Sequence, residues 1–147
     1  MNYWIVVRKD LKKPYSDKNL AITKNELWLN SNDKNEDEPR KYDQIFTQIQ
    51  KGDWLLCYCG YDKEICAVLE AGDKLSDNKG IVLKFKDTLN VPLKTIKSDK
   101  NYKKLLSLSP KKYSPFTQGE SKSNIFYGSF FAISKAQFYY ICALSVE

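Results

Sequence analysis

A charged turn followed directly by two apolar runs is the feature that most constrains this chain. The turn is Lys51-Gly52-Asp53, and the apolar run that follows it is Trp54-Leu55-Leu56-Cys57-Tyr58-Cys59. The segment Gly60–Glu64 separates this run from a second one, Ile65–Leu69. Apolar runs of this length bounded by Gly and Asp are typical of strands, and the short connection between them predicts a β-hairpin. The rest of the chain must pack on this hairpin.

The segments around the hairpin predict further strands and helices. We expect strands over 2–8, 80–86 and 124–133, and an edge strand over 91–96, because a central strand excludes Pro92. The turn-forming composition of 72–79 predicts a loop. Apolar residues at helical spacing predict a helix over 42–49, and Asp99 is positioned to cap another that carries Tyr102. The closing helix has a capping box, with Ser134 as N-cap and Gln137 three residues later.

The order of these elements predicts the fold class. The chain shows no internal repeat and no alternation of strand and helix, which argues against a doubly wound parallel sheet. We therefore expect a single domain over 1–147, of the α+β class, built as a mostly antiparallel β-barrel of about six strands with flanking helices. A length of 147 residues suits one domain with one core.

The charge of the chain is concentrated in one segment. The net charge is +6, from 24 basic and 18 acidic residues, and residues 94–122 alone contain eight lysines against Asp99 and Glu120. A lysine-rich surface attracts phosphate without reading bases. The alternative is an ordinary solvated face that has no ligand.

Cysteine and histidine usage bears on chemistry and location. The four cysteines, Cys57, Cys59, Cys66 and Cys142, include no Cys-x-x-Cys pair, so buried reduced thiols are a better interpretation than a zinc site. Histidine is absent, which removes the commonest general base, and we expect neither an enzyme nor a cofactor or metal. No apolar run reaches the ~20 residues of a membrane span, and the N-terminus lacks the features of a secretion signal. A cytoplasmic protein without a membrane partner is expected.

Four segments together resemble the EVE domain, a member of the PUA-like group related to YTH domains. They are the Tyr-Trp strand at 2–7, the tryptophan Trp28 in the following loop, the helix and Lys-Gly-Asp turn with its aromatic strand at 49–58, and the closing strand with its Ser-capped helix at 133–141. Their order covers nearly the whole chain. The chain departs from the family at Cys59, where EVE domains often carry a histidine, and it lacks their Trp-Asp-Gly-Val-Arg-Asn segment. These departures resemble the EVE modules that are fused to bacterial restriction systems.

The resemblance implies a PUA-like fold that holds one modified base, flipped out of its stack, in an aromatic pocket. Stacking on an aromatic side chain returns about 1–3 kcal/mol per base, which offsets the cost of flipping. The implied pocket is made by Trp28, Tyr58, Arg8, Lys9, Asp10, Asn30, Asn32 and Tyr127. Trp28 also has a structural alternative, as a lid over one end of the barrel. The implied phosphate contacts are Lys103, Lys104, Lys111, Lys112 and Lys122.

The leading functional hypothesis is a module that reads a modified, methylated base in DNA, as part of a restriction or defence system. Its partners would be nucleic acid and a nuclease or NTPase subunit, fused to it or separate. The first alternative is an RNA-binding PUA-like domain. Two further ones are a nucleotide- or small-ligand-binding enzyme that uses the same pocket, and a protein–protein interaction module. Binding to methylated and plain oligonucleotides separates these hypotheses.

Overall fold

The computed structural model describes residues 1–8, 26–27, 48–60, 62–74, 81–108, 114–116 and 130–145. Its strands and helices, in chain order, are β1 (Tyr3–Arg8), β2 (Glu26–Leu27), β3 (Trp54–Cys59), β4 (Glu64–Lys74), β5 (Ile81–Pro92), α3 (Leu93–Ile96), α4 (Asp99–Ser107), β6 (Phe130–Ile133) and α5 (Lys135–Ala143). Among the described residues, none of the helices combines the length and the apolar character needed to cross a bilayer.

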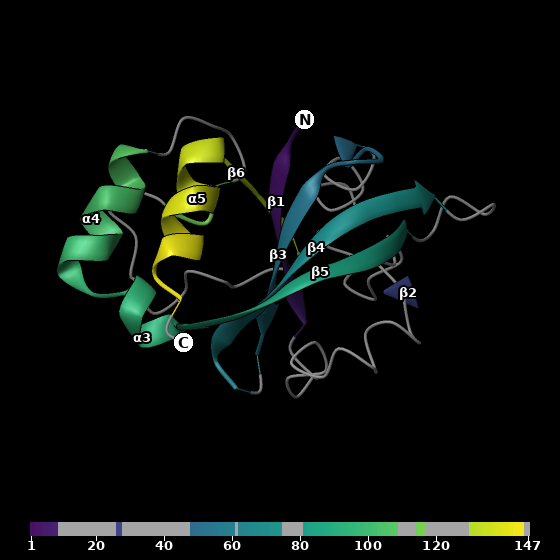
Figure 1. Cartoon of the computed structure of the whole chain (residues 1–147). Helices are drawn as coiled ribbons and strands as arrows, with labels where there is room; N and C mark the ends of the chain where they lie inside the picture. The colour runs from purple at the N-terminus through teal and green to yellow at the C-terminus, as the bar shows by residue number, and fades with distance from the viewer. Residues whose placement is uncertain are drawn as a thin grey trace, which may run out of the picture.

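The strands form one mixed sheet, with the helices gathered beside it (Figure 1). The strand order is β2-β5-β4-β3-β1-β6. β1 runs parallel to β3, and every other neighbouring pair is antiparallel. The α+β class and the mostly antiparallel pairing are therefore confirmed. The closed barrel is not, because the described strands end in two separate edges, β2 and β6, and form an open sheet.

The hairpin predicted from the apolar runs is present as β3 and β4. β4 continues to Lys74, into the predicted loop over 72–79, because its partner β5 is also long and pairs with it as far as Ile81. β5 replaces the shorter strand predicted over 80–86. The predicted edge strand over 91–96 is wrong beyond Pro92, where α3 begins. Proline cannot donate a further ladder hydrogen bond, and its fixed φ suits the position before a helix.

Both helices predicted near the C-terminus are present, with one change of cap. α4 buries Tyr102 and Leu105, but its N-cap is Ser98, whose Oγ accepts a hydrogen bond from the Asn101 amide at 3.4 Å, and Asp99 lies in the first turn. α5 has the predicted capping box. The predicted helix over 42–49 lies outside the described residues except for its last two positions.

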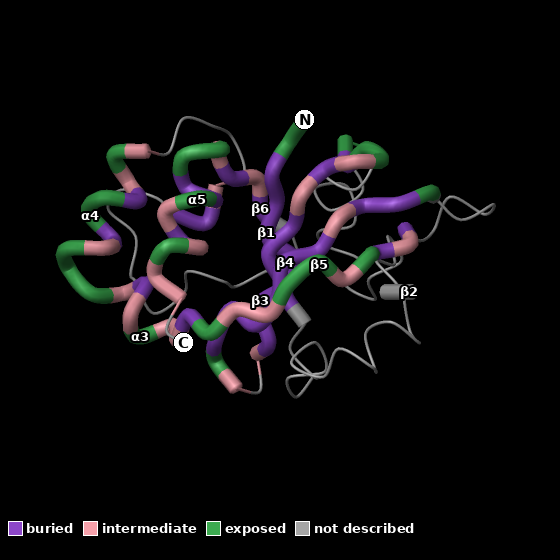
Figure 2. The backbone as a smooth tube through the Cα atoms, in the orientation of Figure 1, coloured by how far each residue is buried: buried purple, intermediate pink, exposed green. Residues whose placement is uncertain are grey.

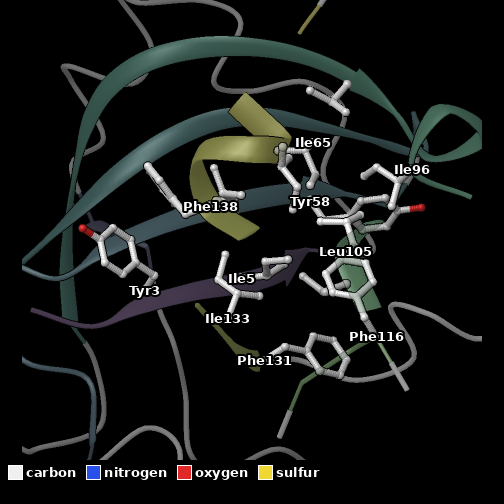
Figure 3. Close-up of a cluster of buried hydrophobic side chains, with 14 of the residues drawn as sticks. Tyr3, Ile5, Tyr58, Ile65, Ile96, Leu105, Phe116, Phe131, Ile133 and Phe138 are labelled. Atoms are coloured by element: carbon white, nitrogen blue, oxygen red, sulfur yellow. The ribbon is translucent and has the colours of Figure 1, made fainter. Parts of the chain in front are cut away.

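Each face of the sheet has its own apolar cluster, and β1 and β3 are buried along nearly their whole length (Figure 2). The cluster on the helix-covered face joins Ile5, Leu56 and Ile65 to side chains of the helices, including Leu105, Phe138 and Ile141 (Figure 3). The cluster on the opposite face is built from Trp4, Val6, Leu55, Cys57, Cys59, Cys66, Leu69 and Leu83. Both faces are buried, which explains why β1 and β3 are apolar at nearly every position rather than at alternate ones.

The Lys-Gly-Asp turn owes its form to one buried carboxylate. Asp53 is only 3% exposed. Its Oδ1 accepts a hydrogen bond from the Asn2 amide at 3.0 Å, and its Oδ2 accepts from Trp4 Nε1 at 3.0 Å and from the Gln50 amide at 2.9 Å. Gly52 has a φ of 94°, which favours glycine. The turn therefore ties the start of β3 to the start of β1 and sets their parallel register.

Candidate nucleic-acid interface

The outer surface of α3 and α4 is basic. Within residues 93–108, five lysines stand against one acidic residue, Asp99. Lys103 and Lys104 of the predicted phosphate contacts are both exposed on α4. Tyr102 and Leu105 on the same helix are buried in the core, so the side of α4 that carries the two lysines faces solvent. Their exposure is what phosphate binding requires, and whether they bind phosphate stays a prediction.

A shallow hollow of about 470 Å³ lies against this basic surface. It is lined by Lys100, Lys103, Lys104, Ser107 and Tyr140. The Tyr140 hydroxyl, from α5, donates a hydrogen bond to Asn101 Oδ1 at 2.7 Å and so holds the two helices together. A hollow with lysines around an aromatic ring can take a phosphate and the sugar or base beside it.

A second hollow, of about 530 Å³, lies where the β3–β4 turn meets α3. It is lined by Asp62, Lys63, Pro92, Leu93, Lys94 and Lys97. The Leu93 amide donates a hydrogen bond to the Lys63 carbonyl at 2.8 Å, which fixes the turn against the helix. Lys63 has a φ of 52°, a left-handed conformation that is uncommon outside glycine and asparagine. The turn thus places Lys63 beside Lys94 and Lys97.

The sheet register brings this second hollow to the end of β1. Arg8 pairs with Cys59, Cys59 with Glu64, and Glu64 with Pro92. These residues form one row across the sheet, and neighbouring strands are about 4.8 Å apart. The predicted pocket position Arg8, of which the backbone is described, therefore lies at the same end of the sheet as the hollow.

Tyr58, a predicted pocket residue, lies in the core. It shares the helix-covered face with Leu56, as the strand alternation indicates, and is 6% exposed (Figure 3). Burial raises the pKa of its hydroxyl above the usual value, so the ring stays neutral at physiological pH. A base could stack on Tyr58 only by displacing neighbours such as Ile65. Tyr58 is therefore a core residue that packs near the C-terminal end of β3.

Most of the other predicted site residues belong to segments other than those that the structure describes. The pocket residues Lys9, Asp10, Trp28, Asn30, Asn32 and Tyr127 and the phosphate contacts Lys111, Lys112 and Lys122 lie outside the described residues. Sequence reasoning missed Lys63, since nothing local indicates that its turn packs on α3. Lys94, Lys97 and Lys100 belong to the predicted basic segment but not to the predicted phosphate contacts, although the 3–4-residue spacing of Lys97, Lys100, Lys103 and Lys104 is a helical signal.

Comparison with solved structures identifies the fold. The chain superposes on protein Rpa0253 from Rhodopseudomonas palustris with a TM-score of 0.63 at 12% identity, covering 99% of this chain and 93% of that one. Protein PSPTO5229 from Pseudomonas syringae gives a TM-score of 0.60 at 14% identity, over 98% and 99% of the two chains. The Mmi1 YTH domain gives 0.50 at 8% identity, over 98% and 94%.

These matches define the class of fold. The α+β fold of this chain is similar, along nearly its whole length, to that of a YTH domain and to those of two bacterial proteins. No protein-family model matches the chain, and no curated protein sequence matches it either.

Proposed function

We propose that this protein is a nucleic-acid-binding module that recognises a modified base. The observation that carries the proposal is the YTH-type fold, present over nearly the full chain together with the lysine-rich surface of α3 and α4. The Tyr-Trp strand and the Lys-Gly-Asp turn that prompted the EVE resemblance are the structural elements that assemble this sheet, which supports the EVE branch of the class. Methylated DNA is the leading substrate, RNA is the alternative, and a role in a restriction system belongs to the same proposal.

The basic surface and the base pocket would have separate tasks. Lysines contribute affinity through the phosphates without distinguishing bases, whereas a stacked and hydrogen-bonded base supplies selectivity. Burying one additional methyl group stabilises binding by on the order of 0.8 kcal/mol, so polar contacts must add to the discrimination. Trp28 is the proposed stacking partner, with Asp10 as the proposed contact to the base edge.

The test is direct binding to matched oligonucleotides. DNA and RNA of one sequence, each with and without a single methylated base, are titrated against the protein and followed by fluorescence anisotropy. We expect tighter binding to the methylated strand. Trp28→Ala should weaken that binding by roughly 5- to 150-fold, the equivalent of one stacking partner, without changing the salt dependence.

Tyr139→Ala is the matched control, because it removes an aromatic ring that is 56% exposed on α5. It should leave binding unchanged. Equal affinity for methylated and plain strands of both DNA and RNA would refute the reader function. Retained selectivity in a folded Trp28→Ala variant would refute only the assignment of Trp28.

A further inference from the structure

Three cysteine sulfurs converge in the apolar cluster on the sheet face opposite the helices. Cys57 and Cys59 lie two residues apart on β3 and point to the same face, and Cys66 reaches them from β4. The three Sγ atoms all lie within 4.8 Å of one another. Their residues are 0–1% exposed.

A β-bulge produces this convergence. Cys57 pairs with Ala67 and Tyr58 pairs with Ile65, so Cys66 is the extra residue of β4 and has no position opposite it on β3. The bulge places Cys66 on the same face as its neighbour Ala67, which strict alternation would forbid. Two ligands on one strand and a third on its neighbour then surround one point.

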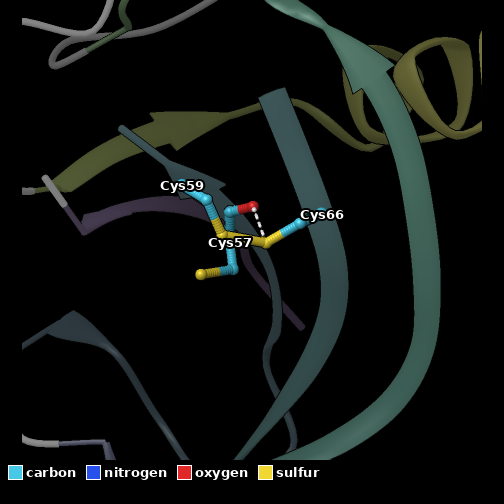
Figure 4. The surroundings of a disulfide bond; sticks show 3 residues. All are labelled: Cys57, Cys59 and Cys66. Carbon is cyan, nitrogen blue, oxygen red and sulfur yellow. Dashed lines mark hydrogen bonds between the residues drawn. A yellow bond between two sulfur atoms is a disulfide. The ribbon is translucent and has the colours of Figure 1, made fainter. Parts of the chain in front are cut away.

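The structure shows the oxidised state of this cluster (Figure 4). Cys59 and Cys66 form a disulfide with a Cα–Cα distance of 6.3 Å, which replaces the fully reduced state expected from the sequence. Cys57 lies outside this disulfide, and its carbonyl oxygen is 3.5 Å from Cys66 Sγ. Once reduced, a Cys66 thiol would donate a hydrogen bond to that carbonyl.

We propose that the reduced cluster binds one soft d10 metal ion through the sulfurs of Cys57, Cys59 and Cys66. Thiolates select soft ions such as Cu(I) and Zn(II). An ion about 2.3 Å from each sulfur requires that no two sulfurs be more than ~4.6 Å apart. The three Sγ atoms, all within 4.8 Å of one another, come close to this requirement. Structural zinc takes four ligands, so a set of three donors fits Cu(I) better. This site is independent of the proposed nucleic-acid binding.

Loading and oxidation exclude each other. A dithiol reductant transfers two electrons and two protons to the Cys59–Cys66 disulfide, which gives two thiols while the reductant becomes a disulfide. Metal binding then releases the thiol protons of the three cysteines to solvent. Reoxidation of the Cys59 and Cys66 thiolates passes two electrons to a disulfide oxidant, which takes two protons from solvent and becomes a dithiol; the ion is released and Cys57 takes up a proton. Because the sulfurs are buried, we expect slow exchange of the bound ion.

The experiment titrates the reduced 147-residue chain with Cu(I), buffered by a chromophoric chelator, without oxygen, and with Zn(II) in a parallel arm. We expect one ion per chain and a proton release that rises with loading. Cys57→Ser, Cys59→Ser and Cys66→Ser should each lower the affinity by more than about 100-fold, beyond the effect of losing a supporting residue around a metal site. Protein oxidised to the Cys59–Cys66 disulfide should bind no ion at this affinity.

Cys142→Ser is the matched control, because Cys142 is partly buried against the cluster on the helix-covered face. Burial, with the Asp87 charge, raises the pKa of its thiol to about 11. The variant should bind like the parent. Cd(II) absorption of the parent counts bound thiolates without any variant, and three are expected. A zinc ion held by all three sulfurs supports the site with zinc as its ion. Fewer than three thiolates, no binding by the reduced parent, or equal binding by a folded Cys57→Ser variant overturns it.

Discussion

At the scale of single residues, Asp53 contributes more to the fold than its charge in a turn suggests. One carboxylate accepts three hydrogen bonds, and two of the donors, the Asn2 amide and Trp4 Nε1, belong to a part of the chain about fifty residues away. A buried anion is stable only when it is paired or fully hydrogen-bonded, and here the bonds supply that environment. The aspartate of the Lys-Gly-Asp turn is therefore a structural residue rather than a ligand contact.

Asp53→Ala should destabilise the protein by roughly 2–4 kcal/mol, because it leaves buried donors such as Trp4 Nε1 without an acceptor. Urea unfolding followed by circular dichroism measures the change. The control is Asp73→Ala, which removes an exposed carboxylate whose ion pair with Lys51 spans 3.1 Å and should cost less than about 1 kcal/mol. If the two variants lose the same free energy of unfolding, the buried hydrogen bonds of Asp53 stabilise the fold no more than the exposed Asp73 ion pair does.

At the scale of elements, the capping box of α5 also joins this helix to α4. The Ser134 hydroxyl accepts a hydrogen bond from the Gln137 amide at 3.0 Å and donates one to the Leu108 carbonyl at 2.8 Å. Gln137 is fully buried, and its Nε2 donates to the Leu105 carbonyl at 2.9 Å. The local signal that begins α5 therefore also satisfies carbonyls at the C-terminal end of α4.

Gln137→Leu should cost roughly 1–3 kcal/mol, because the Ser134 amide loses its side-chain acceptor and the Leu105 carbonyl keeps only the Leu108 amide as a donor. Ser134→Ala should cost about 1 kcal/mol, the usual value of an N-cap. The double variant should lose less than the sum of the two, because both residues belong to one network. Thermal melting of the three variants, with the exposed Lys135→Ala as control, measures this coupling, and strict additivity would contradict it.

At the scale of the whole molecule, the lysines of α3 and α4 give one side of the protein an excess of positive charge. Lys103→Gln combined with Lys104→Gln should weaken binding equally for methylated and plain strands. It should also lower the slope of log affinity against log salt by up to about 0.9 for each phosphate that the variant no longer neutralises.

Lys51→Gln combined with Lys84→Gln makes the same change of net charge away from α3 and α4, in the Lys-Gly-Asp turn and on β5, and serves as the control. Anisotropy titrations at several salt concentrations compare the two pairs. An unchanged slope in the α4 pair, or the same loss in both pairs, would remove the α4 surface from the interface.

Local patterns in the sequence determined the parts of this fold that depend on neighbouring residues. The apolar runs of β3 and β4, the buried side of α4 and the capping box at Ser134 all follow from periodicity and from hydrogen bonds within a few residues. The surface position of Lys103 and Lys104 follows from the same helical spacing. The order of these local motifs, through its resemblance to the EVE domain, also indicated an α+β fold related to that of YTH domains, although the closed barrel that it implied is not formed by the described strands.

The tertiary structure alone decided which residues meet. The parallel pairing of β1 with β3 depends on Asp53 reaching a distant tryptophan, and the burial of Tyr58 depends on which sheet face the helices cover. The convergence of Cys57, Cys59 and Cys66 depends on one extra residue in β4, and the place of Lys63 depends on a turn packed against α3. The period of two along a strand says which side chains share a face. It does not say where the period breaks or what covers that face, because both are settled by contacts between segments far apart in the chain.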